Sequence, residues 1–215
     1  MRRVFTYLLI TSLSINLFAT GQITDKINYK GNKYELLTLP LEDYFIKNPE
    51  KRPTPKIVST GLWRGYIATF ELINAEIFVK DIKVKDSFNG PYKSVFKKVF
   101  PNKKNVKLEW YSGLLVVVFG NATPKAVGLI IYENYIVLEV NKGNIVKEKQ
   151  FNYNQFEVFK NNQFNFFRKT EDYNKVVISL KKHHIKEVDS LIKFDILNYT
   201  KKILVEQNTA HSLGR

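Results

Sequence analysis

The sequence contains no cysteine, only one methionine and only three histidines among its 215 residues. The absence of cysteine excludes disulfide bridges, cysteine–zinc sites and a lipid attached to a cysteine behind an export signal. The histidines are His183, His184 and His211, and the adjacent pair would point about 100° apart on a helix instead of facing one metal ion. We therefore predict no metal site and no cofactor, and a fold that depends on its apolar core for stability.

Arginine is also scarce, although the chain is strongly basic. The formal net charge is +14, but only six of the 34 basic residues are arginine, at positions 2, 3, 52, 64, 168 and 215. Bidentate recognition of phosphates and bases favours arginine, and the lysines are scattered with acidic residues between them. The composition argues against nucleic acid as a partner and predicts only weak attraction to anionic surfaces.

Residues 1–21 have the pattern of a secretory signal peptide. Arg2 and Arg3 precede a mostly apolar run, and Ala19 and Gly21 supply small residues at the two positions that a signal peptidase reads. The run is shorter than the roughly 20 residues of a membrane-spanning helix. Cleavage would leave Gln22 as the N-terminus of a protein exported to the periplasm or cell envelope, or secreted. Retention as an uncleaved N-terminal anchor is the alternative.

In the remaining chain, strand patterns followed by helix patterns predict a single α+β domain over residues 22–206. Residues 207–215 have no such pattern and are predicted to be a frayed tail. Alternating apolar residues predict an antiparallel β-sheet of about six or seven strands, followed by C-terminal helices packed on one face. A hairpin around Gly31 and a short helix from Leu39 precede the main strands. Those strands are expected near residues 65–72 and 76–84, and then, in a second group that begins near Val106, at 114–119, 126–132, 135–140 and 145–149.

Several local patterns refine this fold. The unbroken apolar run at 114–119 is typical of a strand that is covered on both faces, and residues 120–125 are interpreted as a turn. Residues 92–100 have helical spacing before Pro101. Spaced aromatic residues predict a helix over 153–169. After an N-cap at Thr170, a periodic apolar pattern predicts one long helix or two with a break near Asp189.

The most distinctive stretch is residues 59–71, in which Trp63 and Arg64 lie between two glycines, Gly61 and Gly65. Glycine permits tight turns or the close approach of another segment. The indole of Trp63 could stack on the guanidinium, or it could pack beneath the sheet while Arg64 points outward.

Arg64 has two interpretations. It closes a loop by bonding backbone carbonyls or by pairing with Glu109 or Glu71, or it binds a ligand. Trp110 and Tyr111 follow Glu109, and aromatic residues beside an acid can form a platform for sugars. The candidate binding residues are Trp63, Arg64, Tyr66, Glu109, Trp110 and Tyr111.

The run Ser-Thr-x-x-Trp-Arg-Gly-Tyr-x-Ala-x-Phe-Glu resembles the central motif of a family of small bacterial α+β proteins with no assigned activity. Further similar segments are Ile27, Tyr29, Gly31 and Tyr34 in the hairpin, residues 40–45, Phe100-Pro101, residues 110–113 and Tyr132-Glu133. The resemblance covers most of the chain after residue 21. It departs at Ala126-Val127-Gly128-Leu129, where the family has an aromatic residue and Gly-Tyr-Gly, and some members have no signal peptide.

Two functions remain, because the chain has no Gly-x-Ser-x-Gly elbow, no phosphate-binding glycine loop and no His-Glu-x-x-His motif. We expect a non-catalytic exported protein that binds an envelope protein or an incoming protein, as immunity proteins do. The alternative is a small envelope hydrolase that cleaves glycans with paired carboxylates near Trp110. Its candidate acids are Glu71, Asp81, Glu109, Glu133 and Glu139.

Overall fold

The computed structural model describes residues 22–55, 59–87, 89–126 and 129–204, so the predicted signal peptide and the predicted tail lie outside the described residues. The α+β class is confirmed, with mainly C-terminal helices and more strands than expected. The strands are β1 (Asp25–Tyr29), β2 (Asn32–Leu36), β3 (Tyr66–Ile73), β4 (Glu76–Lys85), β5 (Tyr92–Ser94), β6 (Val106–Lys107), β7 (Gly113–Ala126), β8 (Leu129–Asn141) and β9 (Asn144–Asn152). The helices are α2 (Pro40–Lys47), α3 (Phe96–Val99), α4 (Tyr153–Phe167), α5 (Glu171–Lys182), α6 (Val188–Phe194) and α7 (Ile196–Tyr199), with 3-10 turns η1 (Pro49–Lys51) and η2 (Thr60–Leu62). None of the helices in the described ranges is long and apolar enough to cross a membrane.

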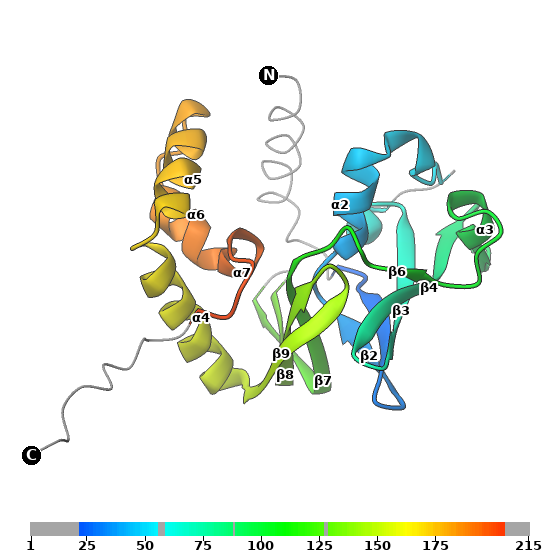
Figure 1. Cartoon of the computed structure of the whole chain (residues 1–215), viewed down its shortest axis with the longest axis horizontal. Coiled ribbons are helices and arrows are strands. Elements are labelled where there is room, and N and C mark those ends of the chain that lie inside the picture. The colour runs from blue at the N-terminus through cyan, green and yellow to red at the C-terminus, as the bar shows by residue number, and fades with distance from the viewer. Residues whose placement is uncertain (1–21, 56–58, 88, 127–128, 205–215) are drawn as a thin grey trace, which may run out of the picture.

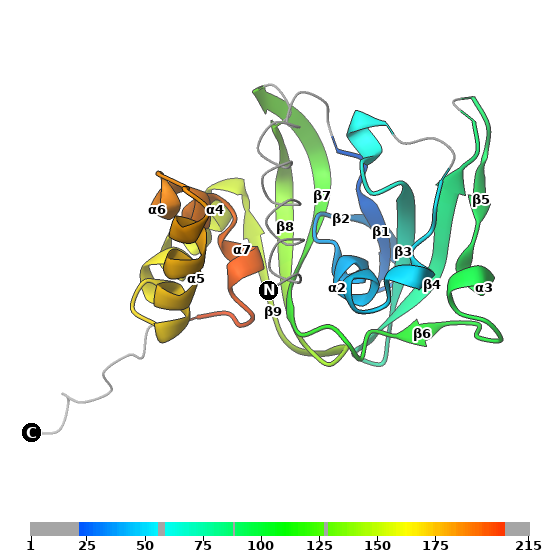
Figure 2. The ribbon, with the colours of Figure 1, turned by 90° about the horizontal axis from the view of Figure 1, so that it is seen from above.

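The sheet curls back on itself around the main core. Its strand order is β3-β1-β2-β7-β8-β9-β4-β5, and β3 also pairs with β4, so the strands from β3 to β4 close into a ring and β5 extends from β4. Neighbouring strands are antiparallel except for β1 and β3, which are parallel. Figure 2 shows α2 in the hollow of this curved sheet, where it buries Leu41 and Phe45. The curvature places side chains from distant strands around one helix.

Strand β7 is covered on both faces, as the apolar run at 114–119 predicted. Leu115 and Val117 belong to the core that surrounds α2. Leu114, Val116 and Val118 face the other way and pack with aromatic residues of α4. The C-terminal helices lie together on this outer side of the sheet (Figure 1).

Helix α4 joins two cores. Phe156 and Phe159 in its first half pack against the outer face of β7 and β8. Phe164 and Phe167 in its second half form a separate cluster with residues of α5, α6 and α7. One continuous helix therefore attaches the helical part of the protein to the sheet.

The turn expected at residues 120–125 is wrong, because β7 continues through it to Ala126. Gly120 adopts a φ of +83°, and the pairing with β8 shifts register between Phe119 and Ala122. This is a bulge, which bends a strand without ending it. Residues 129–141 are accordingly one strand, β8, instead of the predicted pair at 126–132 and 135–140.

Two helical predictions also need correction. The helix expected over 92–100 is shorter, since residues 92–94 pair with β4 as strand β5 and only Phe96–Val99 is helical. The long C-terminal pattern is divided into three helices. The first break follows α5, where His184 has a φ of +61°, and ends at residue 187, near Asp189 as expected. The second break, at Asp195, was not expected. The helix over 153–169 and the Thr170 cap are confirmed, because the Thr170 hydroxyl accepts from Tyr173 N–H.

Gln163 fastens the end of the described chain to α4. Its side chain is fully buried and donates to Thr200 Oγ1 (3.1 Å) and to the Lys202 carbonyl (2.9 Å). Its Oε1 accepts from Leu204 N–H. One amide thus satisfies three groups of a segment that has little regular structure of its own.

We expect Gln163→Leu to lower the free energy of unfolding by about 2–3 kcal/mol, because it leaves buried polar groups of the C-terminal segment without partners. Urea unfolding measures this loss. Asn161→Leu, on the exposed face of the same helix, is the matched control and should change stability by less than about 0.5 kcal/mol. Equal effects of the two substitutions would contradict the role assigned to Gln163.

Candidate functional site

Arg64 forms a buried ion pair with Asp25, an acid that the sequence analysis did not consider. Arg64 Nη2 lies 2.8 Å from Asp25 Oδ1, and the two residues are 4% and 0% exposed. The pairing with Glu109 or Glu71 expected in one interpretation is wrong, since Glu71 pairs with Lys80 and Glu109 is exposed. Arg64 therefore holds the start of β3 against β1 from inside the protein.

The position of Asp25 follows from strand alternation. Asp25, Ile27 and Tyr29 are the buried residues of β1, and Asp25 Oδ1 also accepts from Ala68 N–H of the parallel strand β3 (2.8 Å). Burial raises the pKa of Asp25 to about 6, while the Arg64 guanidinium and the Ala68 N–H oppose this rise. Asp25 Oδ2 and Arg64 Nε have no hydrogen-bond partner among the described residues.

Both the backbone conformation and the space at position 65 require glycine. It adopts a φ of +79°, and a Cβ at this position would lie 2.3 Å from Pro55 Cγ. The close approach that Gly65 permits is therefore made by Pro55, in the loop that follows η1. Trp63, two residues earlier, is half-buried at the end of η2.

Tyr66 connects the buried pair to a second arginine. The Arg64 guanidinium lies over the Tyr66 ring at 5.5 Å, and Tyr66 OH donates to Glu42 Oε1 (2.7 Å). Glu42 also accepts two hydrogen bonds from Arg52, at 2.8 and 3.1 Å. Burial and the nearby carboxylates raise the pKa of Tyr66, which stays a neutral donor. Asp25, Arg64, Tyr66, Glu42 and Arg52 thus form one continuous polar network.

Arg52 brings this network to the wall of a cleft of about 410 Å³. One wall of the cleft is the loop that follows α2. The other is the end of the sheet at β4 and β5, together with helix α3, and Figure 2 shows β5 and α3 at that end. Val84, Val95 and Val99 give it an apolar lining, and Thr54 and Ser94 add hydroxyl groups. The cleft can therefore contact both an apolar and a polar part of a ligand.

The charge of the cleft is positive. Lys51, Arg52, Lys93 and Lys98 line it together with Glu50 and Asp86, which gives four cations against two carboxylates. Arg52 is paired with Glu42 and Lys93 with Asp86. Lys51 and Lys98 form no ion pair in the part of the chain that the structure describes. They remain available to an anionic group, and the paired Arg52 is fixed in position at 32% side-chain exposure.

Of the other predicted site residues, Trp110 contacts helix α2. Trp110 Nε1 donates to the Pro40 carbonyl (3.0 Å), and its ring lies 4.7 Å from that of Tyr44 on α2. Tyr111 OH donates to the Leu114 carbonyl (2.8 Å), and burial raises the pKa of this phenol. Both aromatic residues support the fold, and Glu109 beside them is exposed.

The strand acids of the hydrolase alternative are dispersed. Glu71 pairs with Lys80, and Asp81 accepts from Ser94. Glu133 accepts from Asn121 N–H, and Glu139 accepts from Ile203 N–H. Glu42 interacts electrostatically with Asp25 and with Asp43, but Asp25 and Glu42 are each paired with an arginine. Within the described ranges, no group of three or more acidic or histidine side chains is arranged to hold a metal ion.

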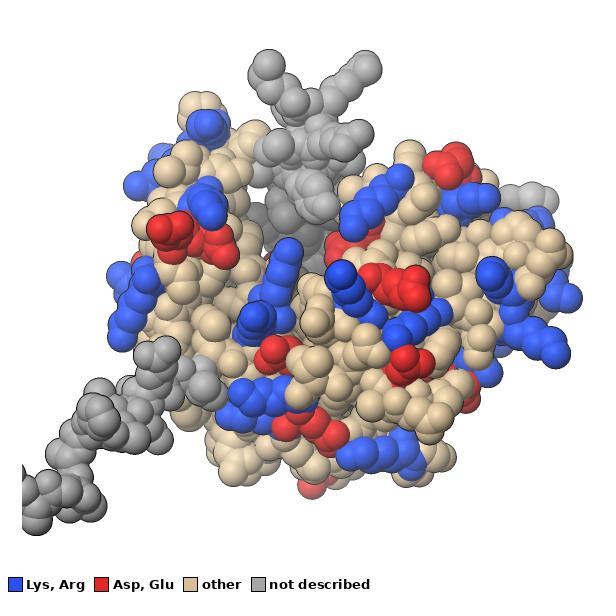
Figure 3. All heavy atoms as spheres, viewed as in Figure 1, with Lys and Arg blue, Asp and Glu red and all other residues tan. Residues whose placement is uncertain are grey.

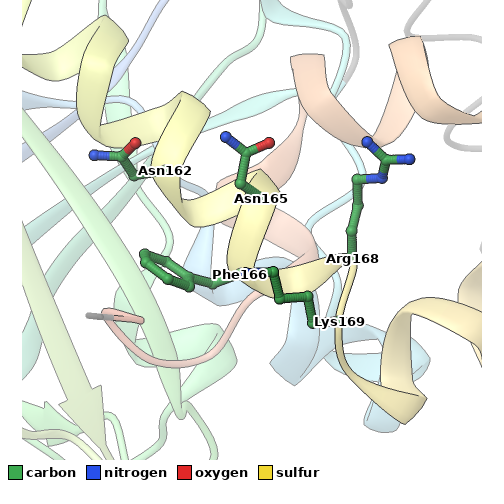
Figure 4. Close-up of a pocket in the computed structure, with 5 residues that line it drawn as sticks. All are labelled: Asn162, Asn165, Phe166, Arg168 and Lys169. Atoms are coloured by element: carbon green, nitrogen blue, oxygen red, sulfur yellow. The ribbon is translucent and has the colours of Figure 1, made fainter. Parts of the chain in front are cut away.

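A second hollow lies over the C-terminal half of α4, where Asn162, Asn165, Phe166, Arg168 and Lys169 line it. Figure 4 shows the two asparagines and Arg168 on one side of the helix and Phe166 on another, so the side chains do not converge. Figure 3 shows basic and acidic side chains interspersed over this face of the molecule. The face drawn in Figure 3 has no continuous basic stripe of the kind that follows a nucleic acid backbone.

Sequence reasoning identified Arg64 and Tyr66 but missed Asp25, Glu42 and Arg52. One signal for Asp25 was present, because it has the same strand parity as Ile27 and Tyr29 and so belongs on the inward face. An inward acid requires a buried cation, and few arginines were available. No comparable local pattern marks the cleft, whose walls come from three separate segments.

No family model, curated protein or solved structure matches the chain.

Proposed function

We propose that the protein is a non-catalytic binding protein of the cell envelope, exported by residues 1–21, and that its cleft receives an anionic group of a partner. The observation that carries this proposal is that Lys51 and Lys98, which form no ion pair with the described residues, line the cleft beside Arg52, whose guanidinium is held by Glu42. Such a site needs no reorganisation of Arg52 when a carboxylate or phosphate arrives. Arg64 and Tyr66 contribute by supporting Glu42, and Trp63, Trp110 and Tyr111 by supporting the surrounding fold.

The cationic cleft is expected to bind small acids that model envelope polymers. Titration calorimetry of the purified protein with glucuronate and with glycerol phosphate measures this. The double substitution Lys51→Gln and Lys98→Gln should weaken binding by about 5-fold or more, and added salt should weaken the wild type, because both reduce charge attraction. Lys181→Gln with Lys182→Gln, on α5, removes the same charge elsewhere and should leave binding unchanged.

Failure of both acids to bind, or an equal loss in the α5 variant, would contradict the cleft as a specific site. Release of new reducing ends from an acidic envelope polysaccharide by the wild-type protein would instead favour the glycan-hydrolase alternative. Substituting Glu109 by Gln then tests whether the carboxylate beside Trp110 carries that activity.

A further inference from the structure

Strand β9 has one open edge. On one side it pairs with β8 from Asn144 to Asn152, with a register shift that leaves Val146 without a partner on β8. On the other side it meets β4 only at Asn144, which pairs with Glu76, and the Ile145 N–H donates to the Ala75 carbonyl (2.8 Å). Within the described chain, no strand covers residues 146–152 on that side. Such an edge presents the N–H and C=O of every second residue, which an extended peptide can pair with.

A groove lies between this edge and α4. It has a volume of about 520 Å³ and is lined by Lys149, Gln150, Phe151, Asn154, Gln155, Val158, Phe159 and Asn162. Three consecutive strand residues line it although their side chains alternate between faces, so the groove includes the strand edge itself. Val158 is 58% exposed, and the rings of Phe151 and Phe159 stack at 4.8 Å. Figure 1 shows α4 leaving the end of β9, which sets the helix beside the strand.

The charges of the groove favour an acidic partner over a second copy of this chain. Lys149 is its only charged lining residue, and Lys147 shares the same face of β9. Neither lysine forms an ion pair with any residue that the structure describes. A two-fold pairing of β9 with β9 centred on Glu148 would bring Lys147 opposite Lys149, and like charges across a strand pair are destabilising. A carboxylate of another protein would be attracted to the same position.

We propose that the β9–α4 groove binds an extended acidic segment of a partner protein, which adds to the sheet as a strand beside β9. Alternate apolar side chains of that segment lie over Phe151 and Val158, and a carboxylate lies beside Lys149. Backbone pairing supplies affinity, and the apolar and basic contacts supply selectivity. This groove shares no lining residue with the cationic cleft, so it can be tested separately from the proposed function.

Selection of a phage-displayed random peptide library against the purified full-length protein tests the proposal. We expect selected peptides with alternating apolar residues and at least one acid, and we expect them to slow amide hydrogen exchange at residues 146–152. Val158→Asp should weaken these peptides by about 10-fold or more, and Lys149→Glu by about 5-fold. Ile178→Asp, at a residue of α5 that is 57% exposed, is the matched control and should not change binding.

The backbone pairing has its own test. A selected peptide that carries N-methyl groups on alternate residues, in the frame that faces β9, should lose binding, and the other frame should retain it. Selection that yields no peptide, peptides that protect other residues, or equal binding of both methylated frames would overturn strand addition. A dimer in sedimentation that dissociates when Val158 is replaced by Asp would replace the partner peptide with a second copy.

Discussion

Replacement of Arg64 by methionine is expected to lower the free energy of unfolding at pH 7 by about 3–5 kcal/mol, the largest effect among our predictions. The substitution keeps an apolar chain of similar length but removes the cation that faces the fully buried Asp25. Breaking one side of a buried ion pair is costly because the remaining charge has neither water nor a counterion. Urea unfolding of both proteins measures the difference.

The loss should depend on pH, and its sign follows from Asp25. The pKa of this carboxyl is raised from 3.8 to about 6 in the folded protein, and removal of the guanidinium raises it further. The folded variant then binds the proton more tightly than the unfolded chain does. Its stability is therefore greatest below the unfolded pKa and falls as pH rises toward the folded pKa, so the loss at about pH 4.5 should be smaller than at pH 7.

Two controls separate this explanation from a general loss of packing. Arg168→Met removes an arginine whose side chain is 52% exposed and lies 3.7 Å from Asp189, and it should cost less than about 1 kcal/mol. Combining Asp25→Asn with Arg64→Met removes the unpaired charge and should recover part of the stability. A loss for Arg64→Met that is the same at both pH values would refute the buried-charge explanation.

Gly65→Ala is expected to cost about 2–4 kcal/mol, which makes it the second large effect. About 1–2 kcal/mol comes from placing a Cβ at positive φ, and the remainder comes from its clash with the Pro55 ring. Gly31→Ala is a matched control, since Gly31 has a φ of +82° but no atom within 4 Å of its added Cβ. Thermal and urea unfolding of the two variants should therefore differ by the cost of the contact with Pro55.

The contact can be relieved from the other side. Pro55→Ala combined with Gly65→Ala should recover part of the stability that Gly65→Ala loses, because the proline ring atoms that the new Cβ meets are removed. Equal losses for Gly65→Ala and Gly31→Ala would mean that backbone conformation alone explains the glycine at position 65. The loop that carries Arg52 would then be held by other contacts.

The strands were predictable where their patterns are local. The alternation after Gly65 predicted β3 and β4 because the face of each side chain follows from its neighbours in sequence. The same logic anticipated the double coverage of residues 114–119. It failed at Gly120, because a glycine at a bulge and a glycine in a turn have the same local composition.

The candidate site was only partly predictable, because its interactions join distant segments. Arg64 was recognisable as unusual, but Asp25 is 39 residues away and reaches it through the parallel pairing of β1 with β3. Strand pairing across that distance has no signature in a single sequence. The cleft combines the loop after α2 with β5 and α3, and the spacing of residues 92–94 predicts a helix where the structure has strand β5. Because the sequence pattern predicts a helix over residues 92–94, it does not reveal that β5 forms part of the cleft wall.

Because helix α4 is continuous, a change in its angle to the sheet would move the cluster of C-terminal helices as a unit. Its 15 residues span about 22 Å. Its first half packs on β7 and β8, and its second half packs in the cluster of α5, α6 and α7. A tilt of α4 by about 10° relative to the sheet would move the far end of the helix by about 4 Å, since the helix is unbroken between its two packed halves. The buried Gln163 resists such a tilt by holding the last described residues against the helix.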